Sequence, residues 1–248
     1  MKYYGLIGQE IGHSFSPAYF AQKFDNEGIF DAHYHCYPLK SIQDFSKLLK
    51  QQPLLSGLNV TIPYKTAIIP YLDCISPQAK AVGAVNTIAF DKGQLIGHNT
   101  DVFGFESSLT NTLLPHHKGC KALILGTGGA SKAVQYVCQR LNIGYQLVSR
   151  TKGKNLIQYA SIDANILSQH LLIINTSPLG MHPNTSSYPL LPYTALSTKH
   201  LLYDLVYNPS ITTFMQKGID IGATVTNGLK MLELQADKSW EIWQNNVT

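Results

Sequence analysis

The chain has 248 residues, of which 44% are hydrophobic and 14% are charged, and its formal net charge is +4. This length suits one large α/β domain or two smaller ones, and the composition excludes a disordered chain. The Lys and Arg residues form no concentrated run, so we expect no binding to nucleic acid or to a membrane surface. The longest apolar runs are only as long as strands, so we expect no membrane-spanning segment.

Strand and helix patterns alternate along the chain, which favours parallel sheets with helices packed on them. In the first part we expect strands at 3–8, 33–37 and 57–62, helices at 17–26 and 41–50, and a hairpin formed by 84–90 and 94–97. Ser16 is expected to cap the first helix, with Pro17 at the first helical position. Ser41 and Asp44 have the spacing of a capping box.

In the second part we expect helices at 101–114, 131–141 and 229–243, and strands at 121–125, 145–149, 171–175 and 201–205. The stretch Pro115–Gly119 interrupts the pattern and is a candidate hinge and domain boundary. Trp240 and Trp243 are spaced to lie on the apolar side of the last helix, where they are expected to pack.

Four cysteines are present: Cys36, Cys74, Cys120 and Cys138. They form no C-x-x-C pair, and a chain of this length does not need disulfides, so we expect reduced thiols in a cytoplasmic protein. The neighbouring His116 and His117 have no convincing set of partner ligands, and neither does the pair His33 and His35. We therefore expect no metal site.

A glycine-rich turn follows the expected strand 121–125. Its residues are Gly126, Thr127, Gly128, Gly129 and Ala130. Glycines at this position allow a tight turn, and the following helix N-terminus presents N–H groups to a pyrophosphate. Because Ser131 stands at the third glycine position of the usual pattern, the motif alone is weak. Its place between a strand and a helix makes it a candidate dinucleotide site.

The next expected strand ends in Ser149, Arg150 and Thr151, with Lys154 close behind. Enzymes that use unphosphorylated NAD commonly place an acidic residue here, which accepts hydrogen bonds from the ribose hydroxyls. A guanidinium suits a 2′-phosphate instead, through its charge and its planar fork of donors. The sequence therefore favours NADP as the cofactor.

Polar residues gather at the ends of elements in the first part of the chain. Ser14 and Ser16 place two hydroxyl groups at the entrance of a helix, a suitable cradle for a carboxylate. Asn59 and Thr61 point to the same side of a strand. Lys65 follows that strand, at the position where catalytic groups of α/β folds tend to lie.

Taken together, these motifs resemble the shikimate dehydrogenase family in the same order and over nearly the whole chain. They are Ser14-x-Ser16-Pro17, Asn59-Val60-Thr61-x-Pro63-x-Lys65, Gly83-Ala84-Val85-Asn86-Thr87, Asn99-Thr100-Asp101, the glycine turn, Asn175–Met181, Asp204–Pro209 and Gly228–Ala236. Ser149 and Lys154 depart from the Asn and Arg that are common in the family. The stretch after Lys154 is short, so we expect a shortened helix there.

The resemblance implies two α/β domains. Residues 1–100 and 227–248 would form a substrate-binding and catalytic domain, and 101–226 a Rossmann-like NADP domain, with the last helix returning to the first. It further implies reversible NADPH-dependent reduction of 3-dehydroshikimate to shikimate, which belongs to chorismate and aromatic amino-acid biosynthesis. The partners would be these small molecules, bound by a monomer or a homodimer.

The resemblance also assigns roles to individual residues. Lys65 and Asp101 would be the catalytic pair. Ser14, Ser16 and Tyr207 would hold the substrate carboxylate, and Asn59, Thr61, Asn86, Asp101 and Gln235 the ring hydroxyls. The residues at the cofactor would be 126–130, Ser149, Arg150, Thr151, Lys154, Leu205 and Gly228.

Two other interpretations stay open. The first is a dehydrogenase of broader specificity that also oxidises quinate or prefers NAD, although Arg150 favours NADP. The second is a binding or regulatory protein without catalysis, which the presence of both Lys65 and Asp101 disfavours. Another two-domain NADP dehydrogenase would not explain the ordered series of polar motifs.

Overall fold

The chain folds into two compact units, and the computed structural model describes residues 1–12 and 14–245. The first unit is Met1–Phe103 with Glu233–Thr248, and the second is Gly104–Leu232. The divisions lie a few residues beyond the boundaries expected at 100 and 227, and residues 246–248 of the expected first domain lie outside the described residues. A boundary at Pro115–Gly119 is wrong, because this stretch lies inside the second unit.

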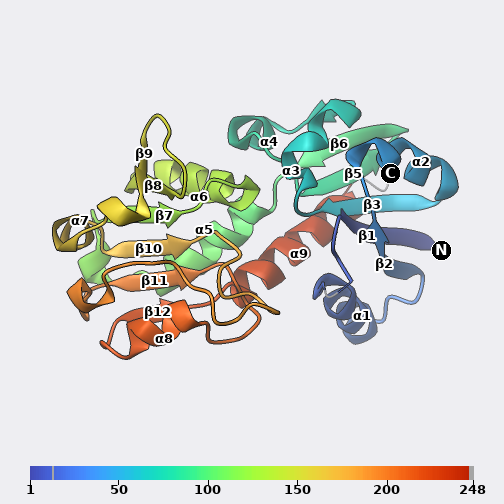
Figure 1. Ribbon diagram of the computed structural model, residues 1–248. Helices are drawn as coiled ribbons and strands as arrows, with labels where there is room; N and C mark the ends of the chain where they lie inside the picture. The colour runs from blue at the N-terminus through green and yellow to red at the C-terminus, as the bar shows by residue number, and fades with distance from the viewer. Residues whose placement is uncertain (13, 246–248) are drawn as a thin grey trace. The chain divides into compact units, whose positions relative to one another are not determined.

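The first unit contains a six-stranded sheet in the order β2-β1-β3-β5-β6-β4 (Figure 1). Its strands are β1 (Lys2–Gly8), β2 (Ala32–Pro38), β3 (Leu55–Val60), β4 (Cys74–Ile75), β5 (Thr87–Asp91) and β6 (Gln94–His98). The sheet is mixed rather than parallel, because β5 pairs antiparallel with both β3 and β6. Lys92 and Gly93 both have positive φ, which gives the expected hairpin a turn that matches the twist of its strands.

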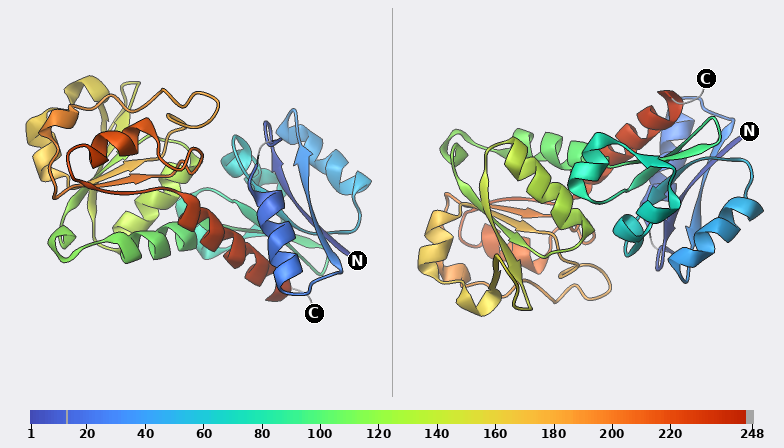
Figure 2. Two further views of the ribbon diagram at one scale, coloured as in Figure 1. Left: turned by 90° about the horizontal axis from the view of Figure 1, so that it is seen from below. Right: turned by 90° about the horizontal axis from the view of Figure 1, so that it is seen from above.

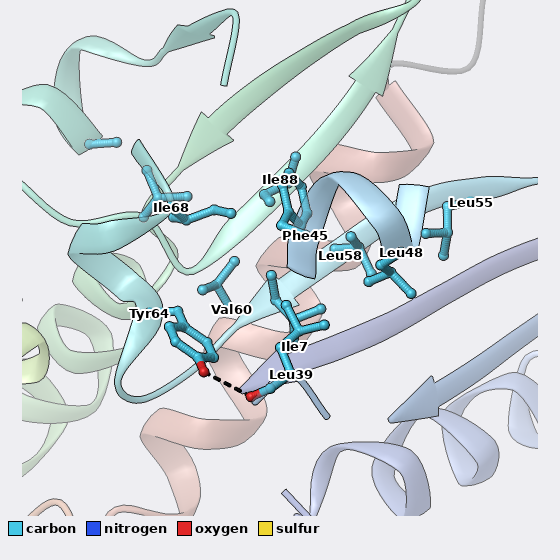
Figure 3. Packing of buried hydrophobic residues seen from close by; sticks show 12 residues of the cluster. Ile7, Leu39, Phe45, Leu48, Leu55, Leu58, Val60, Tyr64, Ile68 and Ile88 are labelled. Carbon is cyan, nitrogen blue, oxygen red and sulfur yellow. Dashed lines mark hydrogen bonds between the residues drawn. The ribbon is translucent and has the colours of Figure 1, made fainter. Parts of the chain in front are cut away.

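Helices cover both faces of this sheet. The helices of the first unit are α1 (Ser16–Asn26), α2 (Phe45–Gln51), α3 (Tyr64–Ala67) and α4 (Pro77–Val82), with the start of α5 (Asp101–Thr112) and most of α9 (Leu229–Asn245). On one face, Phe45 of α2 and Ile68 beside α3 pack with Ile88 of the sheet (Figure 3). On the other face, Trp243 of α9 packs with Phe20 of α1, and Figure 2 shows these two helices beside each other.

Two helix starts in the first unit differ from the expectation. The helix α1 begins at Ser16 itself, and Phe15 is its cap, so Ser16 is the first helical residue rather than the capping residue. The predicted capping box is present, since Asp44 Oδ2 accepts the Ser41 N–H at 3.2 Å. It opens a short 3-10 turn, η1 (Ile42–Asp44), which leads into α2.

The second unit contains a six-stranded sheet in the order β12-β11-β10-β7-β8-β9. Its strands are β7 (Lys121–Leu125), β8 (Gly144–Ser149), β9 (Leu156–Gln158), β10 (Leu172–Asn175), β11 (Leu201–Asp204) and β12 (Thr224–Thr226). All its strand pairs are parallel, as the alternating pattern predicted. The short edge strands β9 and β12 were not predicted.

Three further helices, α6 (Gly129–Arg140), α7 (Ala164–Gln169) and α8 (Thr213–Ile219), belong to the second unit. A loop alone joins β8 to β9, and the first α-helix after Lys154 is the short α7, in agreement with the expected shortening. Both tryptophans of α9 pack in the first unit as expected. In the described part of the chain, no helix is long and apolar enough to cross a membrane.

Candidate active site

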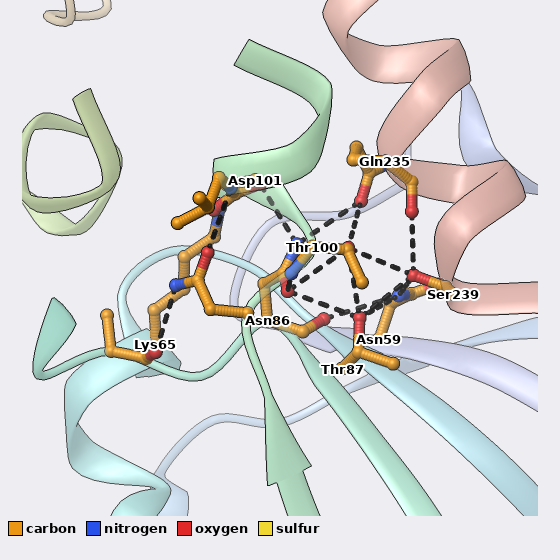
Figure 4. Close-up of polar contacts among 11 residues, drawn as sticks. Asn59, Lys65, Asn86, Thr87, Thr100, Asp101, Gln235 and Ser239 are labelled. Atoms are coloured by element: carbon orange, nitrogen blue, oxygen red, sulfur yellow. Dashed lines mark hydrogen bonds and ion pairs between the residues drawn. The ribbon is translucent and has the colours of Figure 1, made fainter. Parts of the chain in front are cut away.

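Lys65 and Asp101 form an ion pair in the first unit (Figure 4). Lys65 Nζ lies 2.7 Å from Asp101 Oδ2, and the two side chains are 14% and 7% exposed. Lys65 belongs to α3, which follows β3, and Asp101 is the first residue of α5. The Lys65 carbonyl accepts the Val85 N–H at 2.7 Å, which ties this short helix to the segment before β5. The pair therefore combines a cation and a carboxylate in a protected but accessible place.

The amide of Asn86 is held in one orientation beside this pair. Its Oδ1 accepts the backbone N–H of Thr100 at 2.7 Å, so its Nδ2 must point the other way. Nδ2 donates to Asp101 Oδ1 at 2.9 Å and to Gln235 Oε1 at 3.3 Å. Each Asp101 oxygen thus accepts from a donor, Nδ2 of Asn86 on one and the Lys65 ammonium on the other.

Asn59 and Thr61 lie at the end of β3 and just after it. Asn59 is 5% exposed, and its side chain meets Ser239 and Thr87 rather than the Lys65–Asp101 pair. Thr61 is half-buried, and its N–H donates to the Ile7 carbonyl at 2.9 Å. The structure therefore connects Lys65, Asn86, Asp101 and Gln235 directly, and reaches Asn59 through buried hydroxyl groups (Figure 4).

Ser14 and Ser16 lie together at the start of α1. The Ser14 hydroxyl donates to Ser16 Oγ at 3.4 Å and accepts the Ser16 N–H at 3.3 Å. Two hydroxyls beside the start of a helix remain a suitable place for a carboxylate. Tyr207, the third residue expected there, belongs to the second unit and follows β11, so its role in holding the carboxylate stays a prediction.

Four buried residues of this network carry no role in the sequence-based assignment: Tyr34, Thr87, Thr100 and Ser239. The oxygens of Thr87 and Thr100 lie 2.8 and 3.1 Å from Ser239 Oγ. A signal for Ser239 does exist in the sequence. It stands one helical turn after Gln235, between Ala236 and Trp243 on the apolar side of α9, where a hydroxyl needs partners.

The glycine turn of the second unit has the backbone that a pyrophosphate site needs. Gly126 follows β7 with φ of +122°, and an added Cβ would lie 2.7 Å from Thr176 Oγ1. Gly128 caps α6, and an added Cβ there would meet nothing within 4 Å. Gly126 is therefore required by the protein itself, whereas the open side of Gly128 leaves room for a ligand beside the N–H groups of α6.

The basic residues expected at a 2′-phosphate lie in the loop after β8. Arg150, Thr151 and Lys154 are exposed, whereas Ser149 is buried and its Oγ accepts the Thr151 N–H at 3.2 Å. Gln158 of β9 donates to the Arg150 carbonyl at 3.1 Å, which fixes the start of the loop. The loop thus presents cations at the carboxyl edge of the sheet, on the strand next to the glycine turn.

Leu205 and Gly228 meet in the second unit, and their role at the cofactor stays a prediction. Gly228 lies so close to the Leu205 carbonyl that any Cβ would collide with it. Gly228 N–H also donates to the Val206 carbonyl at 3.2 Å. The neighbouring Asp204 is fully buried and accepts hydrogen bonds from Asn175 Nδ2 at 2.9 Å, the Val206 N–H and the Thr212 hydroxyl, so it holds this segment in place.

Burial governs the titration of Asp204. It raises the pKa of the carboxyl from 3.8 to about 6, against the opposing effect of the hydrogen bonds from Thr212, Val206 and Asn175. Part of the population is therefore protonated in mildly acidic solution.

A family profile and a known protein both match this chain. Residues 6–88, which lie in the first unit, match the family profile described as the shikimate dehydrogenase substrate binding domain. Over 98% of this chain and 93% of the relative, the sequence is 35% identical to the shikimate dehydrogenase (NADP(+)) of Bacillus cereus strain G9842.

Two solved structures show the same fold over almost the full length. Shikimate 5-dehydrogenase from Thermus thermophilus, in complex with NADP(H) and shikimate, is 28% identical with a TM-score of 0.87 over 99% of this chain and 94% of that one. Quinate dehydrogenase from Corynebacterium glutamicum, in complex with NAD, is 26% identical with a TM-score of 0.86 over 98% of this chain and 94% of that one.

Proposed function

Since the chain belongs to the shikimate dehydrogenase family, we propose that it interconverts shikimate and 3-dehydroshikimate with NADP as the cofactor, an oxidoreductase reaction at a CH–OH group. The ion pair between Lys65 and Asp101 is the observation that carries the proposal. It supplies a positive charge and a proton-accepting group in the unit that matches the substrate-binding profile. The first unit is accordingly proposed to bind the substrate and the second to bind NADP.

The Lys65–Asp101 pair is proposed to handle the proton of the reacting hydroxyl. In oxidation this hydroxyl loses its proton, and in reduction the ketone oxygen gains one. The Lys65 ammonium also stabilises negative charge that develops on that oxygen. Because the two groups are in contact, the proton is assigned to the pair and not to one member.

The remaining polar groups are proposed to hold the substrate in register with that pair. Ser14 and Ser16 suit the carboxylate, because they gather two hydroxyls at the start of α1. Asn86 and Gln235 suit the ring hydroxyls, since both are joined to the network of Asp101. Thr61, just after β3, completes this set.

The second unit fits a phosphorylated dinucleotide. NADP, when bound, supplies or accepts the hydride. The open backbone at Gly128 and the start of α6 suit its pyrophosphate, and the cations Arg150 and Lys154 suit its 2′-phosphate. Leu205 and Gly228, which contact each other, are also assigned to the cofactor. We also propose a cytoplasmic location, because all four cysteines are free thiols.

A nicotinamide absorbance assay that crosses shikimate and quinate with NADP and NAD tests the proposal. We expect fast turnover with shikimate and NADP only. Comparable rates with quinate or NAD would place the protein with enzymes of broader specificity, such as the similar quinate dehydrogenase. A folded protein that binds NADP but turns over no pair would contradict catalysis and favour a binding protein.

A further inference from the structure

A buried chain of hydrogen bonds runs from β2 to α9 through the side chain of Asn59. Figure 4 shows its part from Asn59 to Ser239. The Tyr34 hydroxyl donates to Asn59 Oδ1 at 2.8 Å, and Asn59 Nδ2 donates to Ser239 Oγ at 2.9 Å. Ser239 in turn donates to the Gln235 carbonyl at 2.9 Å. Asn59 is 5% exposed and Ser239 is fully buried, so water does not compete for these bonds.

The donors and acceptors in this chain permit one orientation of the Asn59 amide. Nδ2 faces the Asn86 carbonyl and Thr87 Oγ1, both at 3.2 Å, in addition to Ser239. A turned amide would place Oδ1 against the Asn86 carbonyl oxygen, leaving two acceptors without a proton between them. The Asn86 carbonyl therefore sets the orientation of the amide, and the Tyr34 and Ser239 hydroxyls hold it on either side.

Packing holds the Tyr34 hydroxyl in place. Its ring stacks on Phe20 with a centroid distance of 4.3 Å and an interplanar angle of 15°, and Trp243 lies against it. Burial raises the pKa of Tyr34 well above its ordinary value, against a lowering effect of the Ser16 side chain. The hydroxyl therefore keeps its proton and remains the donor to Asn59.

The other end of this series of hydrogen bonds reaches the groups that the proposed function assigns to the ring hydroxyls. Ser239 Oγ lies 3.1 Å from Thr100 Oγ1, and Thr100 N–H fixes the Asn86 amide. The backbone carbonyl of Gln235 accepts from the Ser239 hydroxyl, while its side-chain Oε1 accepts from Asn86 Nδ2. Ser239 thus contacts Thr100, which anchors the Asn86 amide, and the backbone of Gln235, whose side chain meets Asn86.

We propose that Tyr34 and Ser239 are positioning residues that act through Asn59 to hold the substrate-binding amides of Asn86 and Gln235. This inference rests on the proposed function. Asn59 is then the link between them, because its side chain is hydrogen-bonded to both Tyr34 and Ser239.

Two conservative substitutions test the role in substrate binding. Tyr34→Phe and Ser239→Ala each remove one hydroxyl and almost no volume. Each is expected to raise the KM for shikimate about 3- to 10-fold, the loss of roughly one hydrogen bond, with kcat and the KM for NADP within about twofold of the wild type. Because both act through one amide, the double variant should raise KM by less than the product of the single effects.

Tyr203→Phe is the matched control. The Tyr203 hydroxyl is also buried and donates to Ser108 Oγ at 2.7 Å, but it lies in the second unit. The Tyr203→Phe substitution should lower the unfolding temperature and leave the KM for shikimate unchanged. If Tyr34→Phe behaves in the same way, or if it lowers kcat and changes both KM values together, its role is only structural and the inference is wrong.

A second measurement does not depend on activity. In the wild type, the side-chain NH₂ of Asn59 should exchange slowly with solvent when followed by NMR, and exchange should accelerate in Tyr34→Phe and Ser239→Ala but not in Tyr203→Phe. Unchanged exchange in both variants would overturn the hydrogen-bonded chain. Accelerated exchange in a protein without shikimate activity would refute the proposed function and the positioning role. The series of hydrogen bonds through Asn59 would still be supported.

Discussion

Lys65 Nζ and Asp101 Oδ2 lie 2.7 Å apart although the residues are 36 positions apart in the sequence. Lys65 lies in a short helix that follows a strand of the first sheet, and Asp101 begins the helix that follows another strand of the same sheet. The fold brings them together at a sheet end, and Asn86 holds Asp101 from the other side at 2.9 Å. The cation and the carboxylate therefore form a pair, and the effect of removing either group on turnover can be measured.

Substitution of Lys65 should abolish most of the turnover. In Lys65→Ala, we expect kcat for shikimate oxidation to fall about 10²- to 10⁴-fold, because the proton-transfer pair and its positive charge are lost. The dissociation constant of NADP, measured by fluorescence titration, should stay close to that of the wild type. Lys80→Ala, an exposed lysine of α4 in the same unit, is the control and should keep full activity. Full turnover in Lys65→Ala would remove Lys65 from the mechanism.

Arg150 should set the preference for the phosphorylated cofactor. In Arg150→Ala, we expect the KM for NADP to rise about 10- to 100-fold, since charged hydrogen bonds to the 2′-phosphate are lost, while the KM for NAD stays nearly constant. Steady-state kinetics with both cofactors measure the ratio. Arg140→Ala is the matched control, because Arg140 pairs with Glu106 at 3.2 Å on the surface. Equal effects of Arg150→Ala on the two cofactors would contradict a 2′-phosphate contact.

The two glycines of the turn should respond differently to alanine. Gly126→Ala should lower the stability by more than about 1 kcal/mol, because φ is positive and the Cβ would crowd Thr176 Oγ1. Gly128→Ala should leave the unfolding temperature nearly unchanged, since an added Cβ meets no atom of the protein, but should weaken NADP binding. Thermal unfolding and NADP titration of both variants separate the two effects. Unchanged NADP affinity in Gly128→Ala would exclude a pyrophosphate at this backbone.

The buried Asp204 should make stability depend on pH. Its pKa is raised in the folded protein from 3.8 to about 6, so the folded state binds this proton more tightly than the unfolded state. The resulting stabilisation is complete below pH 3.8 and is lost as the pH rises through 6. From this single group we expect a loss of about 1 kcal/mol between about pH 5 and about pH 7.5.

Asp204→Asn provides the comparison for this pH effect, because an amide does not titrate. Denaturant unfolding at several pH values should show the stability of the wild type, relative to the variant, decreasing over the same pH range. A constant difference between wild type and variant would show that Asp204 does not titrate in this range.

Much of the fold followed from local patterns in the sequence. The strands and helices around the glycine turn were predicted because apolar periodicity and glycine placement act over a few neighbouring residues. The hairpin was predicted for the same reason, from a turn whose residues adopt positive φ. The short strands β4, β9 and β12 were missed, because two or three residues carry no measurable periodicity.

The sequence by itself determined which polar residues are present at the ends of elements, and their ordered motifs indicated the family and its chemistry. Only the tertiary structure decided which of them meet. The antiparallel insertion of β5 next to β3 places Thr87 opposite Asn59, and the return of α9 brings Ser239 to both. Such contacts join residues far apart in the chain and depend on strand order and on which face of a helix is buried, which no local pattern specifies.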